Sequence, residues 1–277
     1  MKPKLVILGA AAVLLMLGAA SAATLWYHDG KPLPEAADAP LPVPPVPPRI
    51  SVGQDYDTCL NMLPTDPSGA GDFAESWALR GGGEAATHCL ALSKVELGEA
   101  ERGAEMLQTL ATDSHGNNAA RAAIYSQADQ AWFMAGEPDQ ALTSATQGLL
   151  LSSDDVDLLM DRAIAAGNLD RYQDALDDLT HALDLDPHRP DALVMRAASW
   201  RHLGHLDLAQ DDIDRALALN HDSAEALLER GILRQRQDDA IGARGDWERA
   251  ITLAPDSGTA DLAQQNLALL DAGPERK

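Results

Sequence analysis

A fixed period of 34 residues runs through the second half of this 277-residue chain. Two columns of identical residues carry it: Ala141, Ala175, Ala209 and Ala243, and Leu151, Leu185, Leu219 and Leu253. A repeat of about 34 residues is typical of helical hairpins that stack side by side. Such stacks work by presenting an extended surface to a partner. The period therefore predicts a recognition protein and not an enzyme.

Four copies of the repeat align at residues 122–153, 156–187, 190–221 and 224–255. Position twenty of each copy is alanine, and position eight is small in three copies but is Asp129 in the first. Because small side chains let two helices approach closely, these columns predict tight contacts within each helix pair. Pro187 and Pro255 end two of the copies, as expected where a helix stops.

These columns resemble the tetratricopeptide repeat, whose pattern runs W-x2-L-G-x2-Y, then A-x3-F, then P. The resemblance implies an all-α fold, a right-handed α-solenoid of about six helical hairpins. Four hairpins are the copies in residues 122–255, and two degenerate hairpins are expected in residues 51–121. Residues 256–277 are expected to form a capping helix and a tail, since the end of a helical stack has an apolar face to cover.

Arginine occupies position seven and aspartate position twenty-three in the last three copies. The pairs are Arg162 with Asp178, Arg196 with Asp212, and Arg230 with Asp246. Both positions lie at nearly equal distance from the turn of an antiparallel hairpin, so we expect three structural ion pairs. The first copy lacks both charges together. The alternative is that these side chains are exposed and never meet, in which case each adds about 0–1 kcal/mol.

The inner surface of tetratricopeptide proteins comes from the first helix of each repeat, and the resemblance implies a partner-binding groove there. Carried over position by position, it consists of Gln130, Phe133, Met134, Met160, Ile164, Asn168, Val194, Arg201, His202, Leu228, Ile232, Gln235 and Arg236. Ser126 belongs to the same face. Exposed apolar strips bind partners, and the alternative is that a neighbouring helix covers this one. The family's clamp for chaperone tails needs Lys and Asn where Met160 and Ile164 stand, so binding of that kind is not expected.

Three basic groove residues, Arg201, His202 and Arg236, stand out in an acidic chain. A positive patch beside an apolar strip would suit a peptide with acidic and apolar residues. The alternative is that these side chains neutralise carboxylates on adjacent hairpins.

The N-terminus has the pattern of an export signal. A basic start at Met1–Lys4 precedes an apolar run at Leu5–Leu17 and a small-x-small site at Ala20-Ser21-Ala22. Residues 1–22 are thus a signal peptide or, if the apolar stretch 5–27 is retained, a single-span membrane anchor. The proline-rich stretch 23–50 is expected to be a linker. Either reading predicts an exported, periplasmic protein.

The chain has two cysteines, Cys59 and Cys89. An even count in an exported chain predicts a disulfide. The alternative is two buried free thiols on neighbouring helices.

The charge and the absence of motifs mainly exclude classes of function. A net charge of −22 repels phosphate backbones, so nucleic acid is not an expected partner. No motif indicates catalysis, a metal site or a cofactor. The expected function is an exported scaffold that binds a protein or peptide partner in the cell envelope. The alternatives are an accessory factor that contacts a glycan, for which Phe133 is the one aromatic groove residue, and a membrane-anchored assembly factor.

Overall fold

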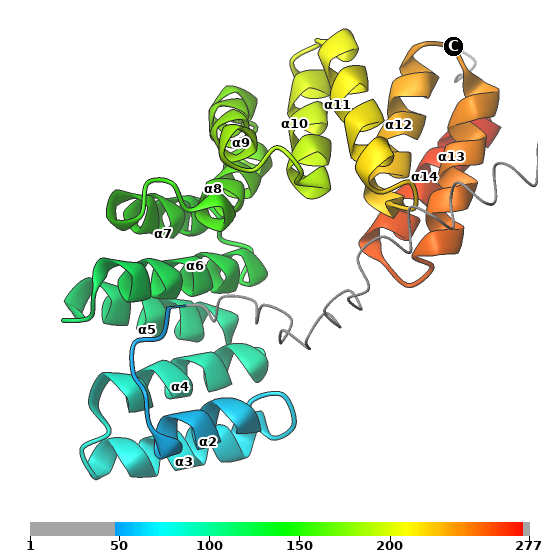
Figure 1. Cartoon of the computed structure of the whole chain (residues 1–277). Coiled ribbons are helices and arrows are strands. Elements are labelled where there is room, and N and C mark those ends of the chain that lie inside the picture. The colour runs from blue at the N-terminus through cyan, green and yellow to red at the C-terminus, as the bar shows by residue number, and fades with distance from the viewer. Residues whose placement is uncertain (1–47, 274–277) are drawn as a thin grey trace, which may run out of the picture. The chain divides into compact units, whose positions relative to one another are not determined.

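Helices make up all the regular structure of residues 48–273, the part of the chain that the computed structural model describes (Figure 1). In chain order these helices are α2 (Gln54–Met62), α3 (Pro67–Leu79), α4 (Gly83–Glu96), α5 (Ala100–Asp113), α6 (Asn118–Met134), α7 (Pro138–Leu151), α8 (Val156–Asn168), α9 (Tyr172–Leu185), α10 (Pro190–His202), α11 (Leu206–Leu219), α12 (Ala224–Arg236), α13 (Ala240–Leu253) and α14 (Gly258–Ala272). The prediction of an all-α stack of helical hairpins is confirmed.

Consecutive helices pack against each other, and the hairpins lie side by side in chain order (Figure 1). The first helices of neighbouring hairpins also touch, as α6 with α8, α8 with α10, and α10 with α12. The last helix, α14, packs on both α13 and α12. The first helices therefore form one layer and the second helices another.

Short-range signals fix where the helices begin. Side chains of Asn117, Asp155 and Ser223 accept hydrogen bonds from backbone N–H groups three residues later, at 2.8, 3.2 and 3.1 Å. These residues cap α6, α8 and α12, because the first N–H groups of a helix have no partner inside it.

The turn inside each hairpin needs one residue in the left-handed backbone region. That residue has a positive φ in all four repeats: Gly136, Asp170, Gly204 and Asp238, with φ of 79°, 58°, 86° and 63°. Glycine adopts this region at no steric cost, whereas aspartate does so with some strain. The turns thus repeat at the same 34-residue period as the alanine column.

Alanines Ala141, Ala175, Ala209 and Ala243 are fully buried, whereas Leu185, Leu219 and Leu253 are partly exposed near helix ends. Position eight of the first helix and position twenty-four of the second helix share one space in the hairpin core. In α12 and α13, Gly231 faces Trp247 so closely that an added Cβ would lie 2.3 Å from the indole nitrogen. The same two positions hold Ala163 with Leu179 in the hairpin α8–α9. A larger residue in one helix is thus matched by a smaller one in the other.

One helix is longer than the period predicts. Helix α6 begins at Asn118 and has 17 residues, whereas α8, α10 and α12 have 13 each. Helix α6 therefore begins four residues before the first aligned repeat at residue 122, because the cap at Asn117 adds one helical turn. The distance from Gly98 to Gly136, the turn residues on either side, is accordingly 38 residues.

The leader at residues 1–22, the anchor alternative at 5–27 and most of the linker at 23–50 lie outside the described residues. Within residues 48–273, no helix has the length and apolar character needed to span a bilayer.

Candidate functional site

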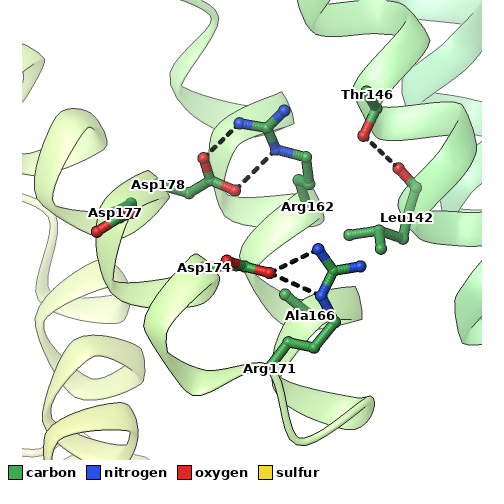
Figure 2. Close-up of a pocket in the computed structure, with 8 residues that line it drawn as sticks. All are labelled: Leu142, Thr146, Arg162, Ala166, Arg171, Asp174, Asp177 and Asp178. Carbon is green, nitrogen blue, oxygen red and sulfur yellow. Dashed lines mark hydrogen bonds and ion pairs between the residues drawn. The ribbon is translucent and has the colours of Figure 1, made fainter.

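The structure brings the arginine and aspartate of each predicted pair together. Arg162 donates to Asp178 through Nε at 2.8 Å and through Nη2 at 2.5 Å (Figure 2). Arg196 makes the same two-pronged contact with Asp212, at 2.7 and 2.8 Å. Each pair joins the two helices of one hairpin. The aspartates are buried, so the pairs neutralise charges that would otherwise be costly inside the stack.

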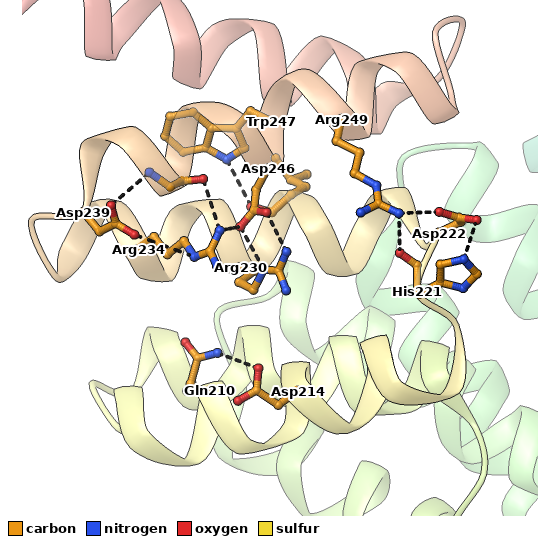
Figure 3. Close-up of polar contacts among 12 residues, drawn as sticks. Gln210, Asp214, His221, Asp222, Arg230, Arg234, Asp239, Asp246, Trp247 and Arg249 are labelled. Carbon is orange, nitrogen blue, oxygen red and sulfur yellow. Dashed lines mark hydrogen bonds and ion pairs between the residues drawn. The ribbon is translucent and has the colours of Figure 1, made fainter. Parts of the chain in front are cut away.

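The last pair has a second arginine. Arg230 donates to Asp246 at 2.9 and 2.7 Å, and Arg234, one turn along α12, donates to Asp246 Oδ2 at 2.7 Å (Figure 3). Asp212 likewise accepts from Arg215 at 3.2 Å. Bidentate arginine–carboxylate contacts are directional as well as charged, so these pairs fix the register of the two helices.

A hollow of about 380 Å³ opens between α7, α8 and α9. Its lining is Leu142, Thr146, Arg162, Ala166, Arg171, Asp174, Asp177 and Asp178. Figure 2 shows two arginine–aspartate pairs in its wall, Arg162 with Asp178 and Arg171 with Asp174. The hydrogen bonds to Asp178 raise the pKa of Arg162. Because both arginines are already occupied, the hollow offers a ligand little unpaired charge.

The predicted groove residues differ in exposure: six are exposed, six are half-buried and one, Met160, is buried. Exposed members are Gln130, Phe133, Met134, Asn168, His202 and Arg236. Half-buried members are Ile164, Val194, Arg201, Leu228, Ile232 and Gln235. The apolar members Ile164, Val194, Leu228 and Ile232 form a half-buried strip on α8, α10 and α12, and the last two also pack against the core cluster that includes Ala263 of α14.

Met160 is the member that the structure removes from this surface. Its side chain is only 6% exposed and belongs to the core cluster that contains Ala192 and Leu193 of α10. A long, flexible methionine fills the contact between neighbouring first helices. The assignment of Met160 to the groove is therefore wrong.

The predicted positive patch is also largely wrong. Arg201 Nε donates to Glu229 on α12, and their side chains are only 11% and 8% exposed, so this guanidinium is already paired and offers little to a partner. His202 stacks on Tyr172 with ring centroids 4.1 Å apart. Burial, Arg201 and Arg236 lower the pKa of His202, which favours its neutral form. Arg236 remains exposed.

Sequence reasoning missed two carboxyl groups on the first-helix layer. Asp129 of α6 is only 4% exposed, and Asp161 of α8 accepts a hydrogen bond from Ser126 Oγ at 2.8 Å. Burial, and secondarily the charge of Asp161, raises the pKa of Asp129 to about 8. Burial also raises the pKa of Asp161 to about 6. The signal was available, since an acid replaces the usual small residue at position eight.

The N-terminal hairpins are held by contacts that do not repeat. The predicted disulfide is present between Cys59 of α2 and Cys89 of α4, with Cα atoms 6.2 Å apart. His88 links α2 to α6, since Nδ1 lies 2.7 Å from the Tyr56 hydroxyl and Nε2 lies 2.6 Å from Gln127 Oε1. Burial lowers the pKa of His88, so a neutral imidazole accepts from Tyr56 and donates to Gln127.

Stacked hairpins with a two-layer helix arrangement define a helical-repeat protein, and comparison with known proteins identifies the repeat. Residues 134–199 match the family model described as Tetratricopeptide repeat. Among curated proteins, none matches the sequence. The chain thus contains tetratricopeptide repeats, matched over residues 134–199.

Solved structures share this fold. One is YrrB, described as a TPR protein with an unusual peptide-binding site, with a TM-score of 0.51 and 18% identity over 70% of this chain and 97% of that one. Another is PilF of Pseudomonas aeruginosa, with a TM-score of 0.59 and 14% identity over 76% and 96% of the two chains. A thermophilic TPR protein of Thermus thermophilus has a TM-score of 0.54 and 17% identity over 67% and 100%. At these identities the likeness concerns the fold.

Proposed function

We propose that this protein is an exported scaffold that binds a protein or peptide partner in the cell envelope through the layer formed by α6, α8, α10 and α12. The fold supports a role in protein–protein interaction, because stacked repeats offer an extended surface. The observation that carries the proposal is the apolar strip of Ile164, Val194, Leu228 and Ile232, half-buried and rimmed by polar side chains.

Two observations support export. The basic start, apolar run and Ala20-Ser21-Ala22 have the order of a signal sequence. The disulfide between Cys59 and Cys89 suits an oxidising compartment, where such bonds persist. Retention of the apolar stretch 5–27 would make the same protein membrane-anchored, and a shift to the mass of residues 23–277 on export would distinguish cleavage from anchoring.

Site-specific photo-crosslinking in cells tests the binding surface. A crosslinking amino acid at Val194 or Ile232 is expected to capture one discrete partner. The matched control is the same amino acid at Thr180, which is exposed on α9 of the other layer. Equal capture from Thr180 would place binding elsewhere and overturn the assignment of the surface.

The oxidation state of the cysteine pair tests the compartment. Thiol trapping of the full chain in living cells is expected to find Cys59 and Cys89 oxidised. A fully reduced pair in cells would contradict export.

We also propose that the protein carries no catalytic activity of its own. Within the described residues, the charged groups that line the hollow between α7, α8 and α9 are largely paired with one another, which leaves little reactive charge.

A further inference from the structure

Asp129 is an anomaly in the contact between α6 and its neighbours. The equivalent position is Ala163, Ala197 or Gly231 in the next three hairpins. The Asp129 side chain is 4% exposed, and its Oδ1 is buried with no hydrogen-bond partner within the described part of the chain. An unsatisfied buried polar atom is destabilising, so its presence calls for an explanation.

A second carboxyl stands on α8, the neighbour of α6 in the first-helix layer. Asp161 accepts a hydrogen bond from Ser126 Oγ, and Gln130 Nε2 lies 3.4 Å from that same hydroxyl. Helices α6 and α8 pack against each other, and the charge of Asp161 contributes, after burial, to the raised pKa of Asp129. Ser126 and Gln130 both belong to the predicted binding surface, so the cluster borders it.

The protein contains a neutralised version of this arrangement. Glu229 stands in α12 where Asp161 stands in α8, and Arg201 donates to it from 28 residues earlier in the sequence. The residue 28 positions before Asp161 is Phe133. One contact between first helices thus supplies its own guanidinium, whereas the equivalent contact between α6 and α8 has an exposed phenylalanine in its place.

We propose that Asp129, Asp161 and Ser126 form a subsite for a guanidinium group, carried on an arginine side chain of the partner. The proposal rests on the proposed function, because it names the chemistry of one partner residue. Within the described residues no group of three or more His, Cys, Asp or Glu side chains could hold a metal ion, which favours an organic cation. The planar guanidinium offers several donors to the two carboxyl groups, and the Phe133 ring at the rim can pack against its face.

Binding is linked to a proton. Asp129 holds its proton at neutral pH, and an arriving cation favours the ionised form. The bound proton then passes to the buffer, and the guanidinium faces two carboxylates. A peptide that bound elsewhere on the surface, without reaching Asp129, would release no proton.

Isothermal titration of the full chain with three short peptides tests the subsite. The peptides are acetylated, amidated Ala-Leu-X-Leu-Ala, with X as arginine, lysine or the neutral isostere citrulline. The arginine peptide is expected to bind at least about tenfold more tightly than the citrulline peptide, since charge-assisted hydrogen bonds are lost with the charge. Repeating the titration in buffers of different ionisation enthalpy is expected to show proton release at neutral pH.

Variants separate the subsite from general electrostatic attraction. Asp161→Asn is expected to lower the affinity for the arginine peptide by at least about tenfold. Asp129→Asn is expected to abolish proton release on binding. The matched control is Asp177→Asn, which removes one exposed carboxylate from α9 and is expected to leave affinity unchanged. Phe133→Arg places an arginine 28 residues before Asp161, the same separation as Arg201 from Glu229. This variant is expected to prevent binding of the arginine peptide and to raise the melting temperature.

Three results would overturn the proposal: equal affinity for the citrulline peptide, no binding of the arginine peptide up to about 5 mM, or unchanged affinity in folded Asp161→Asn. Equal affinity for the lysine peptide would overturn the assignment to a guanidinium. If crosslinking from Val194 still captured a partner, the proposed function would stand without this subsite.

Discussion

Helices α2–α7 and helices α8–α13 each consist of three hairpins, but different polar contacts hold the two regions. The later hairpins use one contact three times, a bidentate arginine–aspartate pair between the two helices. The earlier ones use a disulfide and the contacts of a buried histidine, and they leave Asp129 unsatisfied. The later contacts thus join the two helices of one hairpin, whereas the earlier ones join the first helices of different hairpins, α2 to α4 and α4 to α6.

The difference also separates residues that only stabilise the fold from residues that can take part in binding. The buried aspartates that pair with arginine in α8–α13 find their partners within the chain, so substitutions of these paired residues act on stability. In α6 and the start of α8 the charge balance is incomplete, so substitutions there act on stability and on binding together.

Loss of the disulfide is expected to have the largest effect, and it should be confined to the earlier region. Replacing Cys59 and Cys89 by serine opens a loop with a sequence separation of 30, which costs about 3–4 kcal/mol on the chain-entropy model. Hydrogen exchange is expected to accelerate in α2–α5 and to stay unchanged in α8–α13. Equal acceleration in both regions would show that the chain unfolds as one unit and would break the comparison.

Removal of one arginine is expected to cost slightly less. Arg196→Met leaves Asp212 buried without its main partner and is expected to destabilise the fold by about 3 kcal/mol. Urea unfolding of the double variant with Asp212→Leu should show a smaller loss than the sum of the single losses. Arg215→Met is the control, since this half-exposed arginine is expected to contribute under about 1 kcal/mol. Strict additivity would refute the pairing.

Asp129 is expected to make stability fall as the pH rises. Its pKa is about 8 in the folded chain, so the folded state keeps a proton that the unfolded state releases above about pH 4. The stabilisation is complete below about pH 4 and is lost as the pH rises towards 8. Asp129→Asn should therefore gain stability relative to wild type as the pH rises from about 5 to 8, by at most about 1.4 kcal/mol per pH unit.

Urea unfolding at several pH values measures this gain, and Asp177→Asn serves as the control because its carboxylate is exposed. A pH-independent difference between wild type and Asp129→Asn would contradict the burial of a protonated carboxyl group at this position.

The smallest effect is expected in a turn of the later region. Asp238 has a φ of 63°, and Asp238→Gly should stabilise the fold by about 0.5–1 kcal/mol by relieving the strain. Asp238 is a cleaner test than Asp170, whose carboxylate accepts a hydrogen bond from Tyr172. The reverse change, Gly204→Ala, should lower the melting temperature. A loss of stability in Asp238→Gly would show that the aspartate side chain itself stabilises the turn.

The sequence predicts those features that repeat with constant spacing. The arginine–aspartate pairs follow from a separation of sixteen residues that recurs in three hairpins. The extra turn of α6 does not follow, because residues 118–121 precede the first aligned repeat and the 34-residue period says nothing about them. The cap at Asn117, outside the aligned repeat, decides where that helix begins.

The candidate site is less predictable because it depends on contacts between hairpins. Met160, Val194 and Leu228 occupy one position of the repeat, yet only Met160 is buried, since its length lets it reach the next hairpin. Arg201 reads as a free cation until Glu229, in the following repeat, is placed beside it. Neighbour contacts of this kind depend on side-chain size and direction, which no single repeat contains.

The close approach of Gly231 to Trp247 constrains how these hairpins can diverge. Gly231→Ala alone meets the indole ring, whereas the same change after Trp247→Leu recreates the Ala163 and Leu179 combination of another hairpin. Gly231→Ala is thus unfavourable beside Trp247 but favourable after Trp247→Leu, whereas Trp247→Leu alone leaves a cavity in the core, so either single substitution lowers stability. Over evolutionary time the two positions should covary, and a hairpin grafted between copies retains its stability only if both residues move together.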